Sequence, residues 1–350
     1  MATFSIPNVR IAGIGAAVPK NCFDVMDYTW VSKKEREQLI KTTGVRYKRI
    51  APSGLTVSDM SVEVIEKLLP ALGWLKDEID ALVFISQSRD YLLPATACIL
   101  QHRLGLPKTT MAFDMSMGCS AFVYGLSVLG GMMSMGGIRK ALLIVGDTST
   151  IGSYRDKTTF PLFGDAAAVA ALEYQQDYPL MHVNMQTDGS GYDAILVRGG
   201  GARHFPDKKS LEYKKYGKGV WRHDLHPRLD GIKVFNFSLR EVVPNMKNLL
   251  KAANIDIASI DYFVLHQANM LINETIRKLL KESPEKFPYS INTYGNTSSA
   301  SIPLTIVHAL GEVIREHPLR LLLTGFGVGL SWGSVVVETD KIVVNNVMEI

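Results

Sequence analysis

The chain has 350 residues, of which 47% are hydrophobic and 21% charged, the balance of a packed globular protein. Its net charge of +4 is too small to indicate nucleic acid, and no window holds the roughly 18 continuous apolar residues of a membrane span. Three widely spaced cysteines argue against a disulfide scaffold, and residues 1–9 lack a signal-peptide pattern, so we expect a cytoplasmic protein.

The first apolar strand, from Val9 to Gly15, ends on a Gly-Ile-Gly sequence that is typical of the start of a dinucleotide-binding turn. The third glycine of that motif is replaced by Val18, and Pro19 follows at once. No helical pattern begins there. The sequence therefore disfavours a dinucleotide site.

A cysteine at a predicted helix start is the most informative feature of the chain. Cys119 lies in a small-residue turn after an apolar run, and a helix with apolar residues at i, i+3, i+4 and i+7 begins at Phe122. Free backbone N–H groups at a helix start lower a thiol pKa from about 8.5 and can stabilise a developing anion. We therefore predict that Cys119 is a nucleophile. The alternative is an inert core cysteine, which is what we expect of Cys22 and Cys98.

Three blocks of the first half of the chain recur in the same order in the second half. The first block is a helix followed by an Ile-Asp pair and a strand, at 68–83 and again at 249–264. The second is an apolar strand ending in glycine, at 141–146 and 320–325. The third is a Gly-rich turn with a strand ending in glutamate, at 163–173 and 327–338. Continuously apolar strands are typical of sheets covered on both faces. We predict an α/β fold of two similar halves, 1–175 and 176–350.

The segment from Arg198 to Asp230 interrupts this repeat and is basic. Its lysines and arginine are interleaved with aromatic residues: Lys208, Lys209, Tyr213, Lys214, Lys215, Tyr216, Lys218, Trp221 and Arg222. It is either a solvated surface excursion or a docking segment for an acidic partner, because clustered lysines attract anions. Its histidines are loosely spaced and no carboxylate or cysteine completes a ligand set, so we predict no metal site.

Two polar motifs in the second half supply partners for a cysteine. His266 ends an apolar strand, and Asn296 lies in a small polar loop before a helix. We expect both at carboxyl ends of strands, where α/β folds place their chemistry. A nucleophilic cysteine needs a proton acceptor and a group that stabilises developing charge, which these side chains can provide. Alternatively, His266 is a structural residue and Asn296 belongs to an ordinary turn.

Together these motifs resemble the 3-oxoacyl-(acyl carrier protein) synthase III family, the initiating condensing enzymes of the thiolase superfamily. The resemblance runs from the first strand through the Thr-Gly-Val-Arg sequence at 43–46 to the glycine-rich segment 325–333. The Cys119 turn, the His-Gln-Ala-Asn sequence at 266–269 and the Gly-Asn-Thr sequence at 295–297 match the family's three catalytic motifs in order. The resemblance implies a thiolase-like fold with a five-layered αβαβα core, with the cysteine on the first half and the histidine and asparagine on the second.

The resemblance also implies a reaction, a decarboxylative Claisen condensation in fatty-acid or related biosynthesis. Cys119 would take the acyl group from a thioester, and a malonyl thioester would lose carbon dioxide and attack that acyl group. His266 Nε2 and the Asn296 amide would donate hydrogen bonds to the malonyl thioester oxygen. The backbone N–H groups of Cys119 and Val328 would form an oxyanion hole, and the substrate would lie against two neighbouring residues, Phe326 and Gly327.

The partners that the resemblance implies are acyl carrier protein, acyl and malonyl thioesters of coenzyme A or of that carrier, and a second copy of the chain. In the homodimer, the strand near Leu143–Val145 would pair with its symmetry mate. No metal, redox cofactor, nucleic acid or membrane is implied.

Four departures from the family pattern concern the substrate. Gln38 and Thr42 stand where the family has a tryptophan and an arginine that clamp the coenzyme A adenine, and Leu271 stands where an arginine receives the phosphopantetheine carrier. Val328 replaces the middle glycine of a Gly-Gly-Gly loop, which is unfavourable if its φ is positive. We therefore expect a specialised relative that uses an acyl carrier protein or an unusual acyl thioester rather than acetyl coenzyme A.

Three alternatives stay open. A papain-like hydrolase also uses cysteine, histidine and asparagine, but does not need duplicated halves. A non-catalytic partner subunit is disfavoured because Cys119, His266 and Asn296 are all present. A related acyltransferase that acylates an oxygen, nitrogen or sugar nucleophile would use His266 as a general base.

Overall fold

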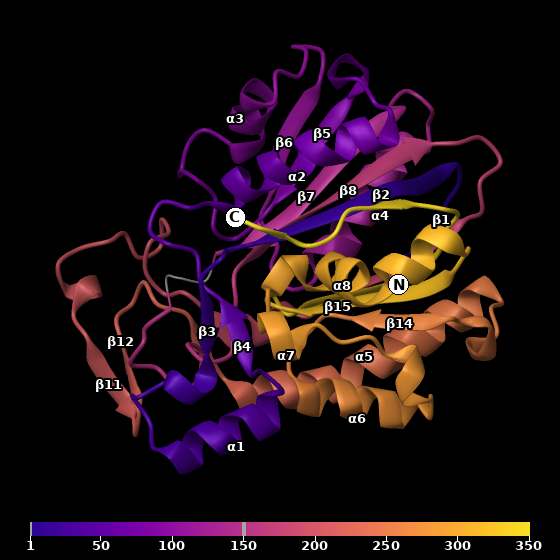
Figure 1. Ribbon diagram of the computed structural model, residues 1–350. Helices are drawn as coiled ribbons and strands as arrows, with labels where there is room; N and C mark the ends of the chain where they lie inside the picture. Colours follow the sequence, from indigo (N-terminus) through magenta and orange to yellow (C-terminus); the bar gives the residue numbers. More distant parts are fainter. Residues whose placement is uncertain (1, 149–151) are drawn as a thin grey trace.

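In the computed structural model, which describes residues 2–148 and 152–350, two β-sheets face each other across a pair of helices (Figure 1). The seven-stranded sheet has the order β17 (Val343–Val344), β2 (Val9–Val18), β8 (Ala166–Tyr174), β7 (Lys140–Asp147), β5 (Ala81–Ile85) and β6 (Met111–Met115), with β18 (Met348–Glu349) also beside β2. The five-stranded sheet has the order β1 (Ala2–Ile6), β9 (Met181–Thr187), β16 (Ser331–Glu338), β15 (Arg320–Gly327) and β14 (Tyr262–Leu265).

Helices complete the layers. Between the sheets lie α4 (Ala121–Met133) and α8 (Ser301–Glu316), whose apolar side chains join those of both sheets in one core. The outer face of the larger sheet is covered by α2 (Val57–Leu72) and α3 (Thr96–Arg103), and that of the smaller sheet by α5 (Gly231–Ala253) and α6 (Met270–Leu280). The predicted five-layered α/β fold is therefore confirmed.

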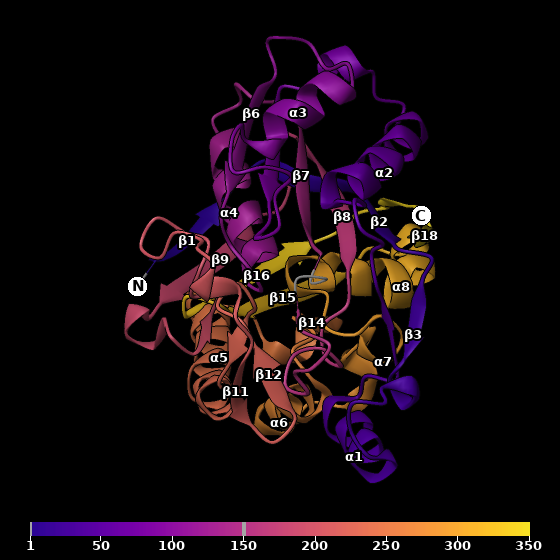
Figure 2. The same ribbon diagram turned by 90° about the vertical axis from the view of Figure 1, so that its left-hand side faces the viewer.

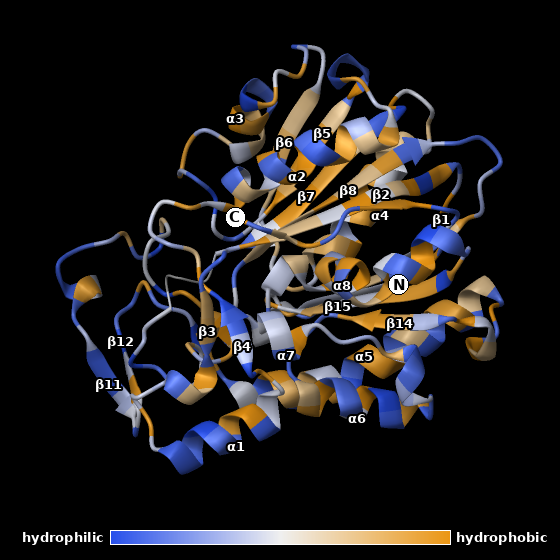
Figure 3. Cartoon of the chain, in the orientation of Figure 1, coloured by the Kyte–Doolittle hydropathy of each residue, from blue (hydrophilic) through white to orange (hydrophobic). Residues whose placement is uncertain are grey.

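Strands buried on both faces explain the continuous apolar runs in the sequence. In β7, Leu143 and Val145 face the central helices, whereas Leu142 and Ile144 face the outer ones. Successive side chains of a strand point to opposite faces, so a strand with helices on both sides needs an apolar residue at every position. Figure 3 shows these strands as hydrophobic and the helices α1 (Lys33–Thr43) and α6 as largely hydrophilic on their outer sides.

The two sheets repeat the same strand order, as the recurring sequence blocks predicted. The order β2-β8-β7-β5 in one sheet matches β9-β16-β15-β14 in the other, with parallel and antiparallel pairs at the same places. The terminal strands cross over, because β1 joins the second-half sheet and β17 and β18 join the first-half sheet. The division at 175/176 into two domains stays a prediction.

The prediction that the strand near Leu143–Val145 pairs with its symmetry mate in a dimer is wrong. Leu143–Val145 belongs to β7, which is hydrogen-bonded to β5 on one side and to β8 on the other. Both of its edges are already occupied, so it cannot bind a symmetry mate. The sheet ends instead at β6, which has β5 on one side only.

The basic excursion and two residues just before it form short antiparallel ribbons. They pair β10 (Ile195–Leu196) with β13 (Arg228–Leu229), and β11 (Lys214–Gly217) with β12 (Val220–Arg222). Figure 2 shows β11 and β12 in front of α5 and α6, with α1 to their right. Trp30 Nε1 donates to the Gly219 carbonyl over 3.1 Å, which ties the tip of the second ribbon to the segment before α1.

The remaining short elements are the hairpin of β3 (Cys22–Asp24) and β4 (Tyr47–Arg49), and α7 (Ile291–Tyr294). Cys22 in β3 and Cys98 in α3 are exposed, so the expectation that they are core residues is wrong. Short edge elements leave their side chains uncovered. Among the helices that the structure describes, none combines the length and apolar character needed to cross a membrane.

Candidate active site

Cys119 lies in the turn between β6 and α4, beyond the carboxyl end of the edge strand of the larger sheet. Its neighbour Ser120 is the N-cap residue and the helix begins at Ala121, so the predicted helix start is confirmed. The cysteine is only 6% exposed. The glycine that ends β15 allows this burial, because the strand comes very close: a Cβ on Gly327 would lie 2.7 Å from the Cys119 Cβ and 2.9 Å from Sγ.

The glycines around Val328 explain how a β-branched residue is accommodated there. Gly327 has a φ of 155° and Gly329 a φ of 140°, while Val328 is not among the residues with positive φ. Because the glycines adopt the conformations that disfavour side chains, the valine does not have to. The backbone N–H groups of Val328 and of Cys119 itself lie close enough to the sulfur to favour its charged form.

The expected lowering of the thiol pKa is wrong. The pKa of Cys119 is raised to about 11, mainly because burial disfavours the charged sulfur and secondarily because the Asp147 carboxylate is close. The Ser298 hydroxyl and the two backbone N–H groups beside the sulfur act in the opposite direction but do not compensate. The helix start supplies the predicted donors, and burial outweighs their effect on the resting thiol.

His266 follows β14 directly and is 1% exposed. Its Nδ1 lies 2.7 Å from the Ser301 hydroxyl oxygen, and its ring meets Phe326 edge-on with centroids 5.5 Å apart. Burial lowers the pKa of His266 to about 3, so the ring is neutral at physiological pH. A serine proton donated to Nδ1 would leave the ring proton on Nε2, the tautomer that can donate toward a substrate.

Asn296 is buried, and both ends of its amide are oriented by hydrogen bonds. Its Oδ1 accepts from the Ser298 N–H over 2.9 Å, and its Nδ2 donates to the Ala268 carbonyl over 3.2 Å. An amide nitrogen has two N–H groups, so one remains for a substrate. Asn296 follows the short helix α7 rather than a strand, contrary to our expectation. The reason is local: the N–H groups of Thr293 and Tyr294 bond to the Ser290 carbonyl instead of to a neighbouring strand.

Ser298 lies next to all three predicted residues. Its hydroxyl oxygen lies 3.9 Å from the Cys119 sulfur, its N–H holds Asn296, and its backbone hydrogen-bonds His266. The structure therefore brings the cysteine, the histidine and the asparagine to one place. Phe326 and Gly327, predicted to contact substrate, line the same place through the His266 ring and the Cys119 side chain.

Two polar residues at this site were missed by the sequence analysis. Asp147 ends β7 and is 6% exposed, and its carboxylate interacts with Ser298 and raises the Cys119 pKa. The rule that α/β folds place their chemistry at carboxyl ends of strands pointed to Asp147 as well as to His266. Ser298 had no comparable signal, because a serine in a polar loop is ordinary turn chemistry.

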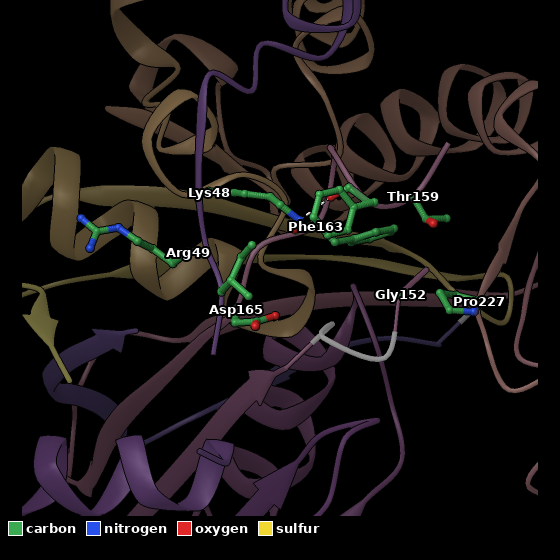
Figure 4. A pocket seen from close by; sticks show the side chains of 9 residues that line it. Lys48, Arg49, Gly152, Thr159, Phe163, Asp165 and Pro227 are labelled. Carbon is green, nitrogen blue, oxygen red and sulfur yellow. Dashed lines mark hydrogen bonds between the residues drawn. The ribbon is translucent and has the colours of Figure 1, made fainter. Parts of the chain in front are cut away.

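Residues 160–164 hydrogen-bond the backbone of Asn296, and a buried lysine holds this segment in place (Figure 4). The Asn296 N–H donates to Leu162 and its carbonyl accepts from Gly164, over 2.9 and 3.0 Å. Lys48 Nζ donates to the carbonyls of Phe160 and Phe163 in this segment, and lines a cavity of about 80 Å³ with Asp165 and Thr159. Burial lowers the Lys48 pKa to about 8, against the opposing effect of Asp165.

The substituted positions lie together on two adjacent helices. Gln38 Nε2 donates to the Thr42 hydroxyl over 3.0 Å on α1, and Leu271 on α6 is 48% exposed. The end of α1 contacts the start of α6. A Cβ added to Gly44, which follows α1, would lie 2.7 Å from the Cβ of Met270, the first residue of α6. The three neutral residues therefore lie on neighbouring helices, α1 and α6, at the lower side of the molecule in Figure 1.

Comparison with known proteins gives a consistent result. Models of the 3-oxoacyl-(acyl carrier protein) synthase III family match residues 113–189, and of its C-terminal part residues 250–339. The beta-ketoacyl-(acyl carrier protein) synthase III of Clostridioides difficile (strain 630) is 32% identical over 334 residues, 94% of this chain and 97% of that protein. The protein of the same name from Streptococcus mutans is 31% identical, over 94% of this chain and 98% of that one.

A solved structure shares the whole architecture. The 3-oxoacyl-(acyl carrier protein) synthase of Burkholderia xenovorans LB400 superposes with a TM-score of 0.93 at 33% identity, covering 99% of each chain. The priming beta-ketosynthase of the R1128 polyketide biosynthetic pathway gives a TM-score of 0.81 at 25% identity, over 95% of this chain and 97% of that one.

Proposed function

Because the chain belongs to the 3-oxoacyl-(acyl carrier protein) synthase III family, we propose roles for its site residues within the activity of that family. The chain is an acyltransferase, a condensing enzyme of fatty-acid biosynthesis that joins a Cys-bound acyl group to a malonyl thioester of the acyl carrier protein. The reaction releases carbon dioxide and yields a 3-oxoacyl thioester. The observation that supports the roles best is the meeting of Cys119, His266 and Asn296 at Ser298.

In the first step, the Cys119 sulfur attacks the carbonyl carbon of the acyl donor and the carrier thiol leaves. The Cys119 and Val328 N–H groups, which lie close to the resting thiol, can stabilise the oxyanion that develops beside the sulfur. Burial raises the pKa of the resting thiol, so the attack needs a proton acceptor rather than a thiolate formed in advance.

In the second step, the malonyl thioester loses carbon dioxide, and the resulting enolate attacks the acyl-enzyme. The neutral His266 ring and the remaining Asn296 N–H stabilise the enolate oxygen as hydrogen-bond donors. A carboxylate at either position would repel that oxygen. A histidine with a pKa of about 3 is a poor general base near neutral pH, which favours condensation over acyl transfer to an oxygen, nitrogen or sugar nucleophile.

The function is tested in two stages by intact-mass analysis and product detection. A panel of acyl coenzyme A and acyl carrier protein donors should add one acyl group to the chain, and malonyl-acyl carrier protein should then remove it as a 3-oxoacyl product. An acyl-enzyme that is discharged only to alcohols, amines or sugars, with no loss of carbon dioxide from malonyl-acyl carrier protein, would favour the related acyltransferase.

The acyl donor is expected to be a carrier protein rather than coenzyme A. Gln38, Thr42 and Leu271 stand where the family has a tryptophan and two arginines, and each lost charged contact to a phosphate is worth roughly 1.5–3 kcal/mol, or about 10–100-fold in affinity. The exposed Lys214 and Lys215 can compensate for an acidic protein but not for a small molecule. We expect acylation at least about tenfold more efficient from the acyl carrier protein, with a preference that weakens as salt is added.

Charge reversal tests this donor prediction. Lys214→Glu with Lys215→Glu should raise KM for the acyl carrier protein and leave coenzyme A thioesters unaffected. The matched control is Lys67→Glu with Lys251→Glu, which changes the net charge equally on exposed lysines of α2 and α5. Equal efficiency from both donors, insensitive to either double variant, would show that the substitutions on α1 and α6 do not select the donor.

We propose a homodimer formed through β6. This strand is an unpaired edge, Met111 on it is 40% exposed, and the nearby loop exposes Leu92 and Leu93 at 71% and 85%. An open strand edge can pair with a strand of another chain, and large exposed apolar patches mark sites of protein interaction. Light scattering at micromolar concentration should give twice the chain mass, and Met111→Lys should shift the species toward monomer. Met135→Lys, at an exposed position in the turn after α4, is the control; a monomeric wild type would contradict the proposal.

We also keep the cytoplasm as the predicted compartment. Cys22 and Cys98 are exposed and unpaired, which suits a reducing environment.

A further inference from the structure

The geometry points to a proton relay for Cys119, in which Ser298 accepts the thiol proton and passes its own hydroxyl proton to the Asp147 carboxylate. The inference rests on the proposed role of Cys119 as the acylated residue. In that role, the buried thiol must give its proton to a neighbouring group.

Asp147 is a buried carboxylate held by neutral donors. Its Oδ1 accepts from the Gln87 N–H over 2.8 Å and from the Ser86 hydroxyl over 3.2 Å, and its Oδ2 accepts from the Ser299 hydroxyl over 2.8 Å and the Ser299 N–H over 3.3 Å. In the described part of the chain, no ion pair includes Asp147. Burial accordingly raises its pKa, which makes it a better proton acceptor than an exposed aspartate.

The Ser298 hydroxyl joins this carboxylate to the sulfur. Its oxygen is 3.9 Å from Cys119 Sγ, at the outer limit of a sulfur hydrogen bond, and its side chain lies close enough to Asp147 to favour the ionised carboxylate. A hydroxyl has one proton and two lone pairs. When that proton is donated to the carboxylate, a lone pair is available for the thiol S–H. The backbone holds the serine at this point with a φ of 49°, an uncommon conformation for a residue other than glycine.

The other titratable side chain at the site does not fit the acceptor role. Nδ1 of His266 is engaged by the Ser301 hydroxyl, and burial holds the ring pKa near 3. Taking a proton would place a positive charge on a ring that is 1% exposed. The carboxylate, by contrast, becomes neutral when it is protonated, which burial favours.

The proton and electron balance of the acylation step is complete. As the sulfur forms its bond to the acyl carbon, the thiol proton moves to the Ser298 oxygen and the serine proton moves to Asp147. The C–S bond of the donor then breaks, and its electron pair leaves on the carrier sulfur. The proton returns through Ser298 to that sulfur, so the carrier leaves as a thiol and Asp147 is again ionised.

The relay is tested with a matched pair of serine variants. Ser298→Ala removes the hydroxyl between sulfur and carboxylate, whereas Ser299→Ala removes a hydrogen bond to the same carboxylate without touching the sulfur. Single-turnover acylation of Ser298→Ala at pH 7 should fall about 10²-fold, the low end of the usual range for a lost acid–base group. Ser299→Ala should lose much less, and both should melt close to the wild type. Equal losses in the two variants would overturn the relay and assign Asp147 a structural role.

A second variant separates charge from proton transfer. The Asp147 charge raises the Cys119 pKa, so Asp147→Asn should lower that pKa and speed iodoacetamide alkylation of Cys119 below pH 8. The relay requires that acylation by the thioester fall at the same time. Faster or unchanged acylation in Asp147→Asn would overturn it.

Failure of the relay and failure of the proposed function give different results. A wild-type chain that never forms an acyl-Cys119 species contradicts the function itself. A wild type that acylates normally, together with a Ser298→Ala variant that acylates at the same rate, contradicts only the relay.

Discussion

Replacing Cys119 with alanine is expected to abolish formation of the acyl-enzyme and to reduce condensation on the order of 10⁴–10⁶-fold, as loss of a covalent nucleophile does in other enzymes. The alanine has no sulfur to bond to the acyl carbon. Gly327 packs closely against this position, since a Cβ added to the glycine would lie 2.9 Å from the sulfur. Alanine is smaller than cysteine, so it fits beside Gly327 without a clash. The variant should therefore fold normally.

Intact-mass analysis after incubation with an acyl donor measures this effect directly. Cys98→Ala is the matched control, because this thiol is exposed and lies on α3. It should acylate like the wild type. An acyl adduct of full occupancy on Cys119→Ala would move the nucleophile to another residue.

Replacing His266 or Asn296 with alanine is expected to separate the two half-reactions. Both variants should still accept the acyl group, because the proposed oxyanion hole of that step consists of the Cys119 and Val328 backbone N–H groups. Decarboxylation of the malonyl donor should fall by about 10²–10³-fold in each, the usual effect of removing one donor to a developing oxyanion.

The measurement compares acyl-enzyme formation with release of carbon dioxide from malonyl-acyl carrier protein. His317→Ala and Asn292→Ala, at exposed positions outside the site, are the matched controls. Loss of acylation in His266→Ala, with circular dichroism unchanged, would favour a general-base role for the histidine. Wild-type rates of decarboxylation in both variants would contradict the condensation mechanism.

The sequence alone was enough to predict the duplicated α/β fold and the position of the cysteine. Apolar periodicity reports local structure: continuous runs mark strands covered on both faces, and the spacing after Cys119 marks α4. Recurrence of these patterns in the same order predicted two sheets with the same strand order. The three short motifs, taken together, also indicated the family.

The tertiary structure decided which strands and side chains surround each residue. The sequence could not show that β7 is enclosed by β5 and β8 while β6 is the open edge, because strand order depends on contacts between segments far apart in the chain. The same holds for the thiol pKa. The helix start is local, but the burial and the Asp147 charge that raise the pKa come from the packed sheets.

Ser298 shows this division most clearly. In the sequence it is one of several small polar residues in a loop, with nothing to distinguish it from Ser299. Folding places its hydroxyl 3.9 Å from a sulfur 179 positions away and beside a carboxylate at the end of β7. Local residue patterns determined which elements form and where the cysteine and histidine lie on them. Only the packing of the two halves decided which side chains surround the sulfur, because those contacts join elements that no local pattern connects.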